Sequence, residues 1–265
     1  NFDSPVATKD DIEYFRNSVK LLFPNAKIDD AHILGTYAGL RPLVREPGKS
    51  ESDISRKHIC MEREDGLFSL LGGKYTTFRA MAEDLIRKYV MRSKKVDITR
   101  GGKINVAKDK KLTREPYRIA LKRNEFEASN QYKAAQGKIH PEILNHLFIE
   151  FGKGALVIID EILKESDLGK QLIEDPNYPP KYFPWVKGEI KYIVKHEIPR
   201  HLNDVLCRRT EICWLVDPSK QRKVADVTAD IMGDLLDWDE DRRQKEIEFY
   251  LNYIKANSVF YKGEI

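Results

Sequence analysis

Apolar residues recur at helical spacing through most of the chain. Near its start, Ile12, Phe15 and Val19 fall on one face of a helix that should begin after Thr8 and end before Pro24. Five similar stripes follow in the second half, at Ile143–Phe148, 155–164, 190–198, 224–235 and 247–254. Each of these helices can bury one face only by packing on its neighbours, so the pattern predicts a small helical bundle.

The first ninety residues also contain strand-like stretches. Residues 32–44 predict a strand interrupted by Gly35 and Gly39, and glycines at such positions are typical of a bulge or a close approach of backbone or ligand. A second strand-like stretch runs from about residue 54 to residue 61. A short apolar run at 66–71 ends at Gly72-Gly73-Lys74, and from Thr76 the period becomes helical.

Residues 93–114 are rich in lysine and arginine and poor in large apolar residues. This composition predicts a basic linker or exposed loop, and we place a domain boundary there. Residues 115–265 are then a helical C-terminal domain, and residues 1–92 a separate segment.

Composition limits the class of protein. Of 265 residues, 41% are hydrophobic and 33% charged, a balance typical of globular proteins, and no apolar run is long enough to cross a bilayer. The 46 basic residues exceed the 42 acidic ones by only 4, an excess that does not by itself indicate nucleic acid. The chain has no signal-peptide pattern and no initiator Met, so we expect its true N-terminus to lie upstream.

The cysteines and histidines show no metal-binding pattern. Cys60, Cys207 and Cys213 lack CxxC or zinc spacing, which favours buried thiols in a reducing compartment. His196 and His201 would lie on different helix faces with Pro199 between them, so we predict no metal site. None of the six histidines pairs obviously with a carboxylate in the sequence, and no catalytic base is assigned.

The glycine turn at 72–73 is the strongest candidate for chemistry. A helix start leaves backbone N–H groups unpaired, glycines let a ligand approach the backbone, and Lys74 adds a full charge. The pattern therefore suits an anion or a polarised carbonyl, although it also fits a plain strand-to-helix connection. A nucleotide-binding P-loop is excluded because Tyr75 follows Lys74 where Ser or Thr is needed.

Arg41 and Arg56 each stand at the end of a strand-like stretch. A lone arginine in such a place is commonly an exposed or salt-bridged residue. Two arginines and Lys74 near one glycine turn would instead suit a small phosphate ester, because guanidinium groups bind phosphate oxygens bidentately.

Five blocks together carry a family resemblance. They are 36–43 (TYAGLRPL), 55–58 (SRKH), 72–83 (GGKYTTFRAMAE), 189–192 (EIKY) and 204–210 (DVLCRRT). In order and spacing, the chain resembles the C-terminal portion of FAD-dependent, aerobic-type glycerol-3-phosphate dehydrogenases.

The resemblance implies a flavoenzyme that oxidises sn-glycerol 3-phosphate to dihydroxyacetone phosphate by hydride transfer to FAD. It implies that Arg41 and Arg56 bind substrate and that Lys74 is catalytic beside the flavin ring. It also implies a cofactor-binding turn made of Gly72, Gly73, Lys74, Tyr75, Thr76 and Thr77. We interpret the block that contains Arg208 and Arg209 as a salt-bridge network at a helix end rather than a second catalytic site.

Partners follow from the same resemblance. We expect glycerol 3-phosphate as substrate, membrane quinone as electron acceptor, no nucleic acid, and a cytoplasmic enzyme peripheral to the inner membrane surface. The oligomeric state stays open, with a homodimer among the options. The alternatives are a glycerol-3-phosphate oxidase that uses oxygen and, in a different class, a basic helical interaction module acting through residues 93–114.

One family feature is absent from the chain, namely the dinucleotide fingerprint G-x-G-x-x-G. We therefore expect residues 1–92 to be an incomplete C-terminal segment of the FAD/substrate domain, and the fragment alone to be inactive and to bind FAD poorly. The expected fold class is mainly α with a minor α/β part, followed by an all-α C-terminal bundle.

Overall fold

The computed structural model describes residues 5–40, 43–44, 48, 57–90 and 115–263. Contacts divide these residues into two compact units. One takes the described residues within Asp3–Ala38 and Thr113–Ile265, and the other those within Gly39–Leu112. The predicted boundary at 93–114 lies outside the described residues and stays a prediction. Among the described helices, none combines the length and the apolar character needed to cross a membrane.

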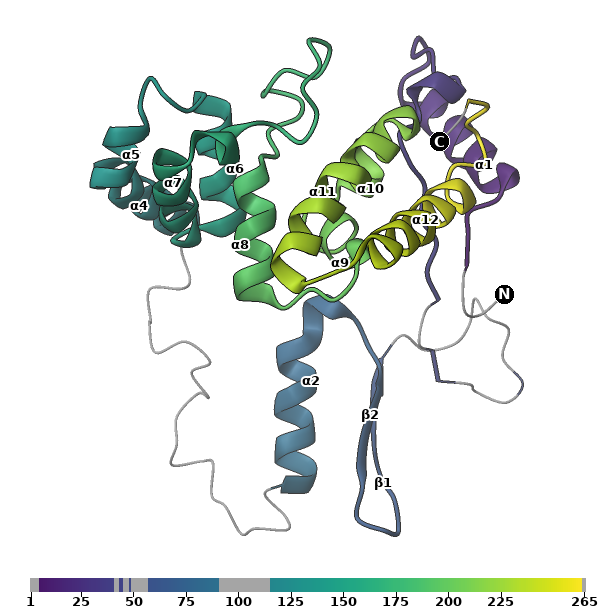
Figure 1. Cartoon of the computed structure of the whole chain (residues 1–265). Helices are drawn as coiled ribbons and strands as arrows, with labels where there is room; N and C mark the ends of the chain where they lie inside the picture. Colours follow the sequence, from purple (N-terminus) through teal and green to yellow (C-terminus); the bar gives the residue numbers. More distant parts are fainter. Residues whose placement is uncertain (1–4, 41–42, 45–47, 49–56, 91–114, 264–265) are drawn as a thin grey trace. The chain divides into compact units, whose positions relative to one another are not determined.

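The larger unit is helical in its described residues (Figure 1). Its α-helices are α1 (Lys9–Leu22), α4 (Glu115–Ala128), α5 (Asn130–Ala135), α6 (Pro141–Phe151), α7 (Gly154–Lys164), α8 (Lys187–Glu197), α9 (Leu202–Leu206), α10 (Ile212–Leu215), α11 (Gln221–Leu236) and α12 (Glu240–Ala256). Short 3-10 turns are η1 (Asp30–His32), η6 (Ser166–Gly169) and η7 (Pro218–Lys220).

Two apolar cores hold the bundle together. One lies among α4, α5, α6 and α7, with Leu147 and Ile159 fully buried. The other lies among α8, α9, α11 and α12, where Tyr250 and Phe183 are fully buried. Trp185 is buried and Trp214 and Trp238 pack partly on this core, as structural anchors rather than exposed stacking surfaces.

Local signals fix the ends of several helices. Thr8 caps α1 through a reciprocal pair in which Thr8 N donates to Asp11 Oδ2 (2.8 Å) and Asp11 N donates to Thr8 Oγ1 (3.3 Å). Pro141 is the first residue of α6, and α8 stops at the left-handed Ile198 before Pro199. The helices predicted from apolar spacing are thereby confirmed.

Helix ends also carry the ion pairs expected around residues 204–210. Arg208 pairs with Asp204, and Arg209 Nε lies 2.7 Å from Glu197 Oε2. The block therefore forms the salt-bridge network predicted for it.

The strand predicted at 32–44 is wrong for the described residues of that stretch, which contain no strand. Residues 35–37 pack instead on the helical bundle. A Cβ on Gly35 would lie 3.1 Å from the Cα of Trp214, Thr36 Oγ1 donates to the carbonyl of Asn257 (2.7 Å), and the Tyr37 ring lies 5.7 Å from that of Trp214. Of the two glycine explanations, close backbone approach holds at Gly35, whereas Gly39 faces open space.

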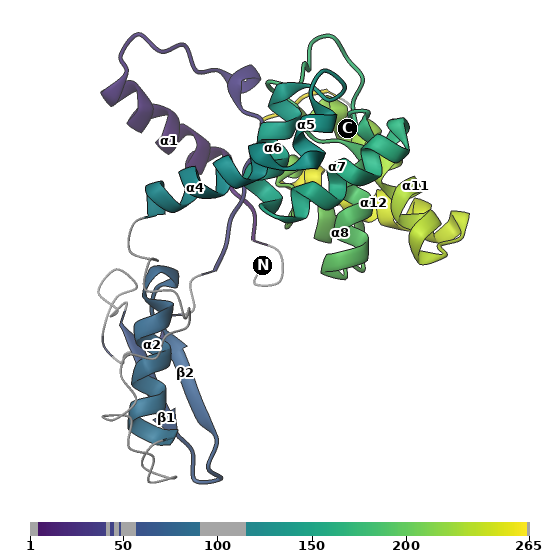
Figure 2. The ribbon, with the colours of Figure 1, turned by 90° about the vertical axis from the view of Figure 1, so that its left-hand side faces the viewer.

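The smaller unit is a hairpin followed by a helix (Figures 1 and 2). Strand β1 (His58–Glu62) pairs antiparallel with β2 (Phe68–Gly72), with Cys60 opposite Leu70 and His58 opposite Gly72. After β2 come η2 (Tyr75–Thr77), α2 (Phe78–Leu85) and the π-helical turn η3 (Ile86–Val90). The mainly α fold class with a minor strand-containing part is confirmed.

Candidate functional site

The turn between β2 and α2 requires glycine. Gly72 and Gly73 have φ values of 71° and 84°, in the left-handed region that side chains disfavour. A Cβ on Gly73 would lie 2.6 Å from Met81 Sδ and 3.1 Å from His58 Cβ. The turn is thus held against both β1 and α2, which fixes where the following backbone emerges.

Lys74 links this turn to the helix. Its backbone is extended, and its carbonyl accepts hydrogen bonds from the backbone N–H (3.0 Å) and the hydroxyl (2.9 Å) of Thr77. Lys74, Tyr75 and Thr76 are all exposed, Tyr75 to 93%. The Thr77 N–H is thus used within the turn, and the exposed residues Tyr75 and Thr76 leave the other first-turn N–H groups and the Lys74 ammonium at an accessible surface.

The arrangement can stabilise negative charge on a ligand that approaches the turn. Partial positive charge at a helix start and the Lys74 ammonium act in the same direction. Met81 and His58 fill the space that a Cβ on Gly73 would occupy, so a flat ring or a carbonyl would approach along the exposed residues 74–76. These residues therefore fit the cofactor expected from the sequence.

A polar cluster lies behind the turn. His58 Nε2 is 3.1 Å from Asp84 Oδ2, Lys88 Nζ is 3.0 Å from the same oxygen, and Cys60 Sγ is 3.9 Å from it. Hydrogen bonds from Lys88 and then from His58 lower the pKa of Asp84. Burial, followed by the charge of Asp84, raises the pKa of the Cys60 thiol.

The expectation that the histidines lack carboxylate partners is wrong. Besides His58, the pairs are His32 with Asp29 (2.7 Å), His146 with Glu189 (2.8 Å) and His201 with Glu246 (2.9 Å). Two of them join residues more than 40 positions apart, so tertiary packing brings the partners together. None of these three lies in the unit that carries the glycine turn.

The predicted phosphate-binding residues Arg41 and Arg56 lie outside the described residues. Their proximity to Lys74 stays a prediction. The cluster of His58, Cys60 and Asp84 was not predicted, although the alternation His-x-Cys on a strand is a signal, because residues two apart on a strand face the same side.

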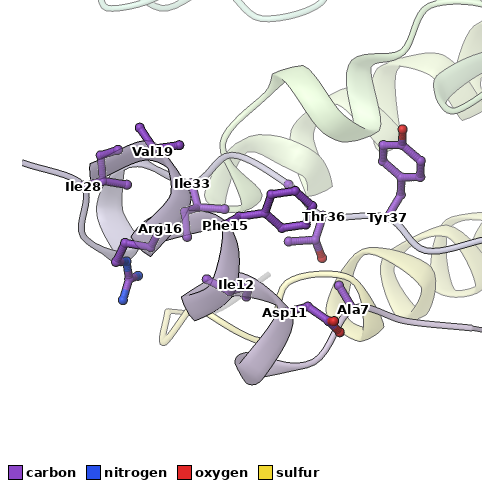
Figure 3. Close-up of a pocket in the computed structure, with 11 residues that line it drawn as sticks. Ala7, Asp11, Ile12, Phe15, Arg16, Val19, Ile28, Ile33, Thr36 and Tyr37 are labelled. Carbon is purple, nitrogen blue, oxygen red and sulfur yellow. The ribbon is translucent and has the colours of Figure 1, made fainter. Parts of the chain in front are cut away.

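A cavity of about 470 Å³ lies elsewhere, in the larger unit (Figure 3). It is lined mainly by apolar side chains, including Ile12, Phe15 and Val19 of α1 and Ile33 of the following segment. Among the described residues that line it, the one cation is Arg16, which is paired with Glu13 (2.9 Å) and Asp30 (2.7 Å). The cavity therefore suits apolar groups better than a phosphate ester, and it is not the predicted site.

Comparison with known proteins decides the family. A family model described as the C-terminal domain of alpha-glycerophosphate oxidase matches residues 68–243. The chain belongs to this family. The resemblance drawn from the five sequence blocks is confirmed.

Several relatives of this alpha-glycerophosphate oxidase-type domain are glycerol-3-phosphate dehydrogenases. A probable glycerol-3-phosphate dehydrogenase, mitochondrial, of Dictyostelium discoideum is 30% identical over 96% of this chain and 38% of its own length. The mitochondrial enzyme of Saccharomyces cerevisiae is 28% identical over 97% of this chain and 41% of its own length. The aerobic enzyme of Staphylococcus aureus is 28% identical over 89% of this chain and 40% of its own length.

A solved structure shares the fold of the alpha-glycerophosphate oxidase-type domain. The glycerol-3-phosphate dehydrogenase of Bacillus halodurans, complexed with FAD, superimposes with a TM-score of 0.66 at 18% identity, over 98% of this chain and 48% of that one. The chain thus spans about two-fifths of the length of the curated relatives that it matches.

Proposed function

We propose that this chain is the C-terminal part of an FAD-dependent glycerol-3-phosphate dehydrogenase. The enzyme oxidises sn-glycerol 3-phosphate to dihydroxyacetone phosphate, and the activity belongs to the complete protein. FAD, when bound, accepts the hydride from the substrate carbinol carbon.

The observation that carries this proposal is the geometry of the turn at 72–77. Two glycines at positive φ lead into an exposed lysine and a helix start, all within the stretch that matches the family model. The Lys74 ammonium and the N–H groups at the helix start would stabilise negative charge that develops on a bound flavin. We assign the backbone that contacts the flavin ring to the other residues of the turn, namely Gly72, Gly73, Tyr75, Thr76 and Thr77.

We assign Arg41 and Arg56 to the substrate, on the resemblance alone. Guanidinium groups that bind the unreacting phosphate would orient the carbinol hydrogen, so that binding energy far from the reacting bond contributes to turnover.

We further propose membrane quinone as the electron acceptor. We place the enzyme in the cytoplasm, peripheral to the inner membrane surface, and propose no nucleic-acid partner; a homodimer stays one option for its oligomeric state. The matched family is named for an oxidase, which favours oxygen as the second candidate acceptor. Oxygen consumption measured against quinone reduction, with glycerol 3-phosphate as donor, separates the two. The basic interaction module would act through residues 93–114, outside the described residues.

The test is substitution in the full-length protein. Lys74→Ala should lower kcat/KM by about 100-fold, the size typical of a lost transition-state charge contact. Arg41→Ala and Arg56→Ala should raise KM and also lower kcat, because the lost phosphate contacts would no longer orient the carbinol hydrogen. Lys245→Ala, an exposed lysine paired only with Asp241 in the described structure, is the matched control and should change neither constant. An unchanged kcat/KM in all three site variants would contradict the site assignment.

A further inference from the structure

Three potential metal ligands of different chemistry meet behind the glycine turn. His58 and Cys60 lie two residues apart on β1 and so face the same side, and Asp84 reaches them from α2. A ring nitrogen of His58, the sulfur of Cys60 and a carboxylate oxygen of Asp84 all lie within 4.8 Å of one another. All three residues are partly buried.

Two of the three ligand-to-ligand distances are close to those around a tetrahedral ion. Zinc bonds of about 2.0 Å to nitrogen and oxygen and about 2.3 Å to sulfur imply ligand-to-ligand edges of roughly 3.3–3.6 Å. The His58-to-Asp84 edge is 3.1 Å and the Cys60-to-Asp84 edge is 3.9 Å, so each needs to change by only a few tenths of an ångström.

We propose that His58, Cys60 and Asp84 form a binding site for a borderline-soft divalent ion such as Zn²⁺, with water in the fourth position. The mixed nitrogen, sulfur and oxygen set selects against Mg²⁺ and Ca²⁺, which prefer oxygen ligands alone.

Lys88 competes with the ion. Its ammonium occupies Asp84 Oδ2 at 3.0 Å, and it must leave before that oxygen can bind a cation. The side chain is 56% exposed, so water can take over its solvation when it leaves.

Binding also releases a proton, because the thiolate is the ligand form of cysteine.

The proposal stands independently of the flavoenzyme assignment, since it rests on β1 and α2 alone. It does place the ion next to the glycine turn, because the β-carbon of His58 would be 3.1 Å from a Cβ on Gly73.

Cobalt titration of the purified chain tests the site. Co²⁺ should produce thiolate-to-metal charge-transfer absorption that excess Zn²⁺ abolishes. Cys60→Ser should abolish the absorption, and Asp84→Asn and His58→Gln should weaken binding at least tenfold. Lys88→Gln tests the same cluster in the opposite direction: it should tighten metal binding, because the ammonium that competes for Asp84 is gone.

A second measurement needs no substitution. Zn²⁺ should slow the alkylation of Cys60 at least tenfold, whereas Mg²⁺ should leave the alkylation rate unchanged. Mass spectrometry of the peptide that contains Cys60 measures this rate. Absence of cobalt charge transfer in the unaltered chain, its persistence in Cys60→Ser, or equal alkylation with and without Zn²⁺ would each overturn the proposal.

Discussion

His146 Nε2 lies 2.8 Å from Glu189 Oε2, and only 1% of the Glu189 side chain is exposed. The other carboxylate oxygen accepts a hydrogen bond from the backbone N–H of Val186 (2.9 Å), so both oxygens are satisfied at the start of α8. Burial raises the pKa of Glu189, and His146 opposes that shift. The pair therefore joins α6 to α8 through a buried polar contact.

Removal of one partner should be costly. His146→Ala leaves the Glu189 carboxylate buried with one oxygen unpaired, and we expect a loss of about 3 kcal/mol in the free energy of unfolding. Urea denaturation followed by fluorescence measures it, since the Trp185 ring lies 5.6 Å from His146. Glu189→Gln is the control, because its amide still accepts from Val186 and donates to His146. A loss below about 1 kcal/mol for His146→Ala would show that the carboxylate finds another partner.

Asp204 predicts a pH dependence. Burial raises its pKa, but hydrogen bonds from the backbone N–H groups of Arg200 (2.9 Å) and His201 (3.0 Å), together with the charge of Arg208, outweigh this effect and lower the pKa overall. A carboxylate with a lowered folded-state pKa contributes stability above its unfolded pKa of about 3.9 and loses that contribution as pH falls through the folded value.

We therefore expect Asp204→Asn to cost about 1–2 kcal/mol near neutral pH, and the difference from the unaltered chain to shrink below about pH 4. Denaturant midpoints across this range check it. Asp226→Asn, which alters an exposed pair with Arg222, should change stability little at either end. A difference that is constant with pH would rule out the ionised carboxylate as its source.

Gly73 should tolerate alanine less well than Gly66. Both have strongly positive φ, 84° and 81°, so both substitutions strain the backbone by about 1 kcal/mol or more. Only at Gly73 would the new Cβ also meet Met81 and His58. Hydrogen exchange of the β1–β2 amides should therefore accelerate more in Gly73→Ala than in Gly66→Ala, and equal acceleration would contradict the steric explanation.

Thr8 should matter to α1 more than Ser18 does. Thr8→Ala removes one half of the reciprocal cap and should cost about 1 kcal/mol of helix stability. Ser18 only bonds back to the Tyr14 carbonyl (2.9 Å) within the helix, so Ser18→Ala should be nearly neutral. Amide exchange at Asp11 and Ile12 reports the difference, and equal protection in both variants would argue against the cap.

Local chemistry explains what the sequence predicted well. The helix boundaries near Thr8, Pro141 and Pro199 follow from the sequence, because each of these residues affects only the backbone a few positions away. The glycine turn between a strand and a helix is likewise local, and the structure places it as predicted, between β2 and the helical stretch that starts at Tyr75.

The wrong or missing sequence predictions fall where residues far apart in the sequence determine the local structure. The stretch at 32–44 has the composition of a strand, but its described part packs on Trp214 and Asn257, which no local pattern indicates. Asp84 lies 26 residues after His58, so the cluster behind the turn becomes visible only once α2 packs on β1.

The hydrogen bond from Thr36 to Asn257 spans 221 positions of the chain. During synthesis the segment around Thr36 leaves the ribosome long before its acceptor exists, by roughly 10–40 seconds at ordinary translation rates. Gly35 and Tyr37 depend on Trp214, which is also made late. The segment around Thr36 must therefore wait unpaired in the nascent chain, and its docking on the bundle becomes a late folding step. A chaperone that shields Tyr37 and its apolar neighbours would protect the segment until then.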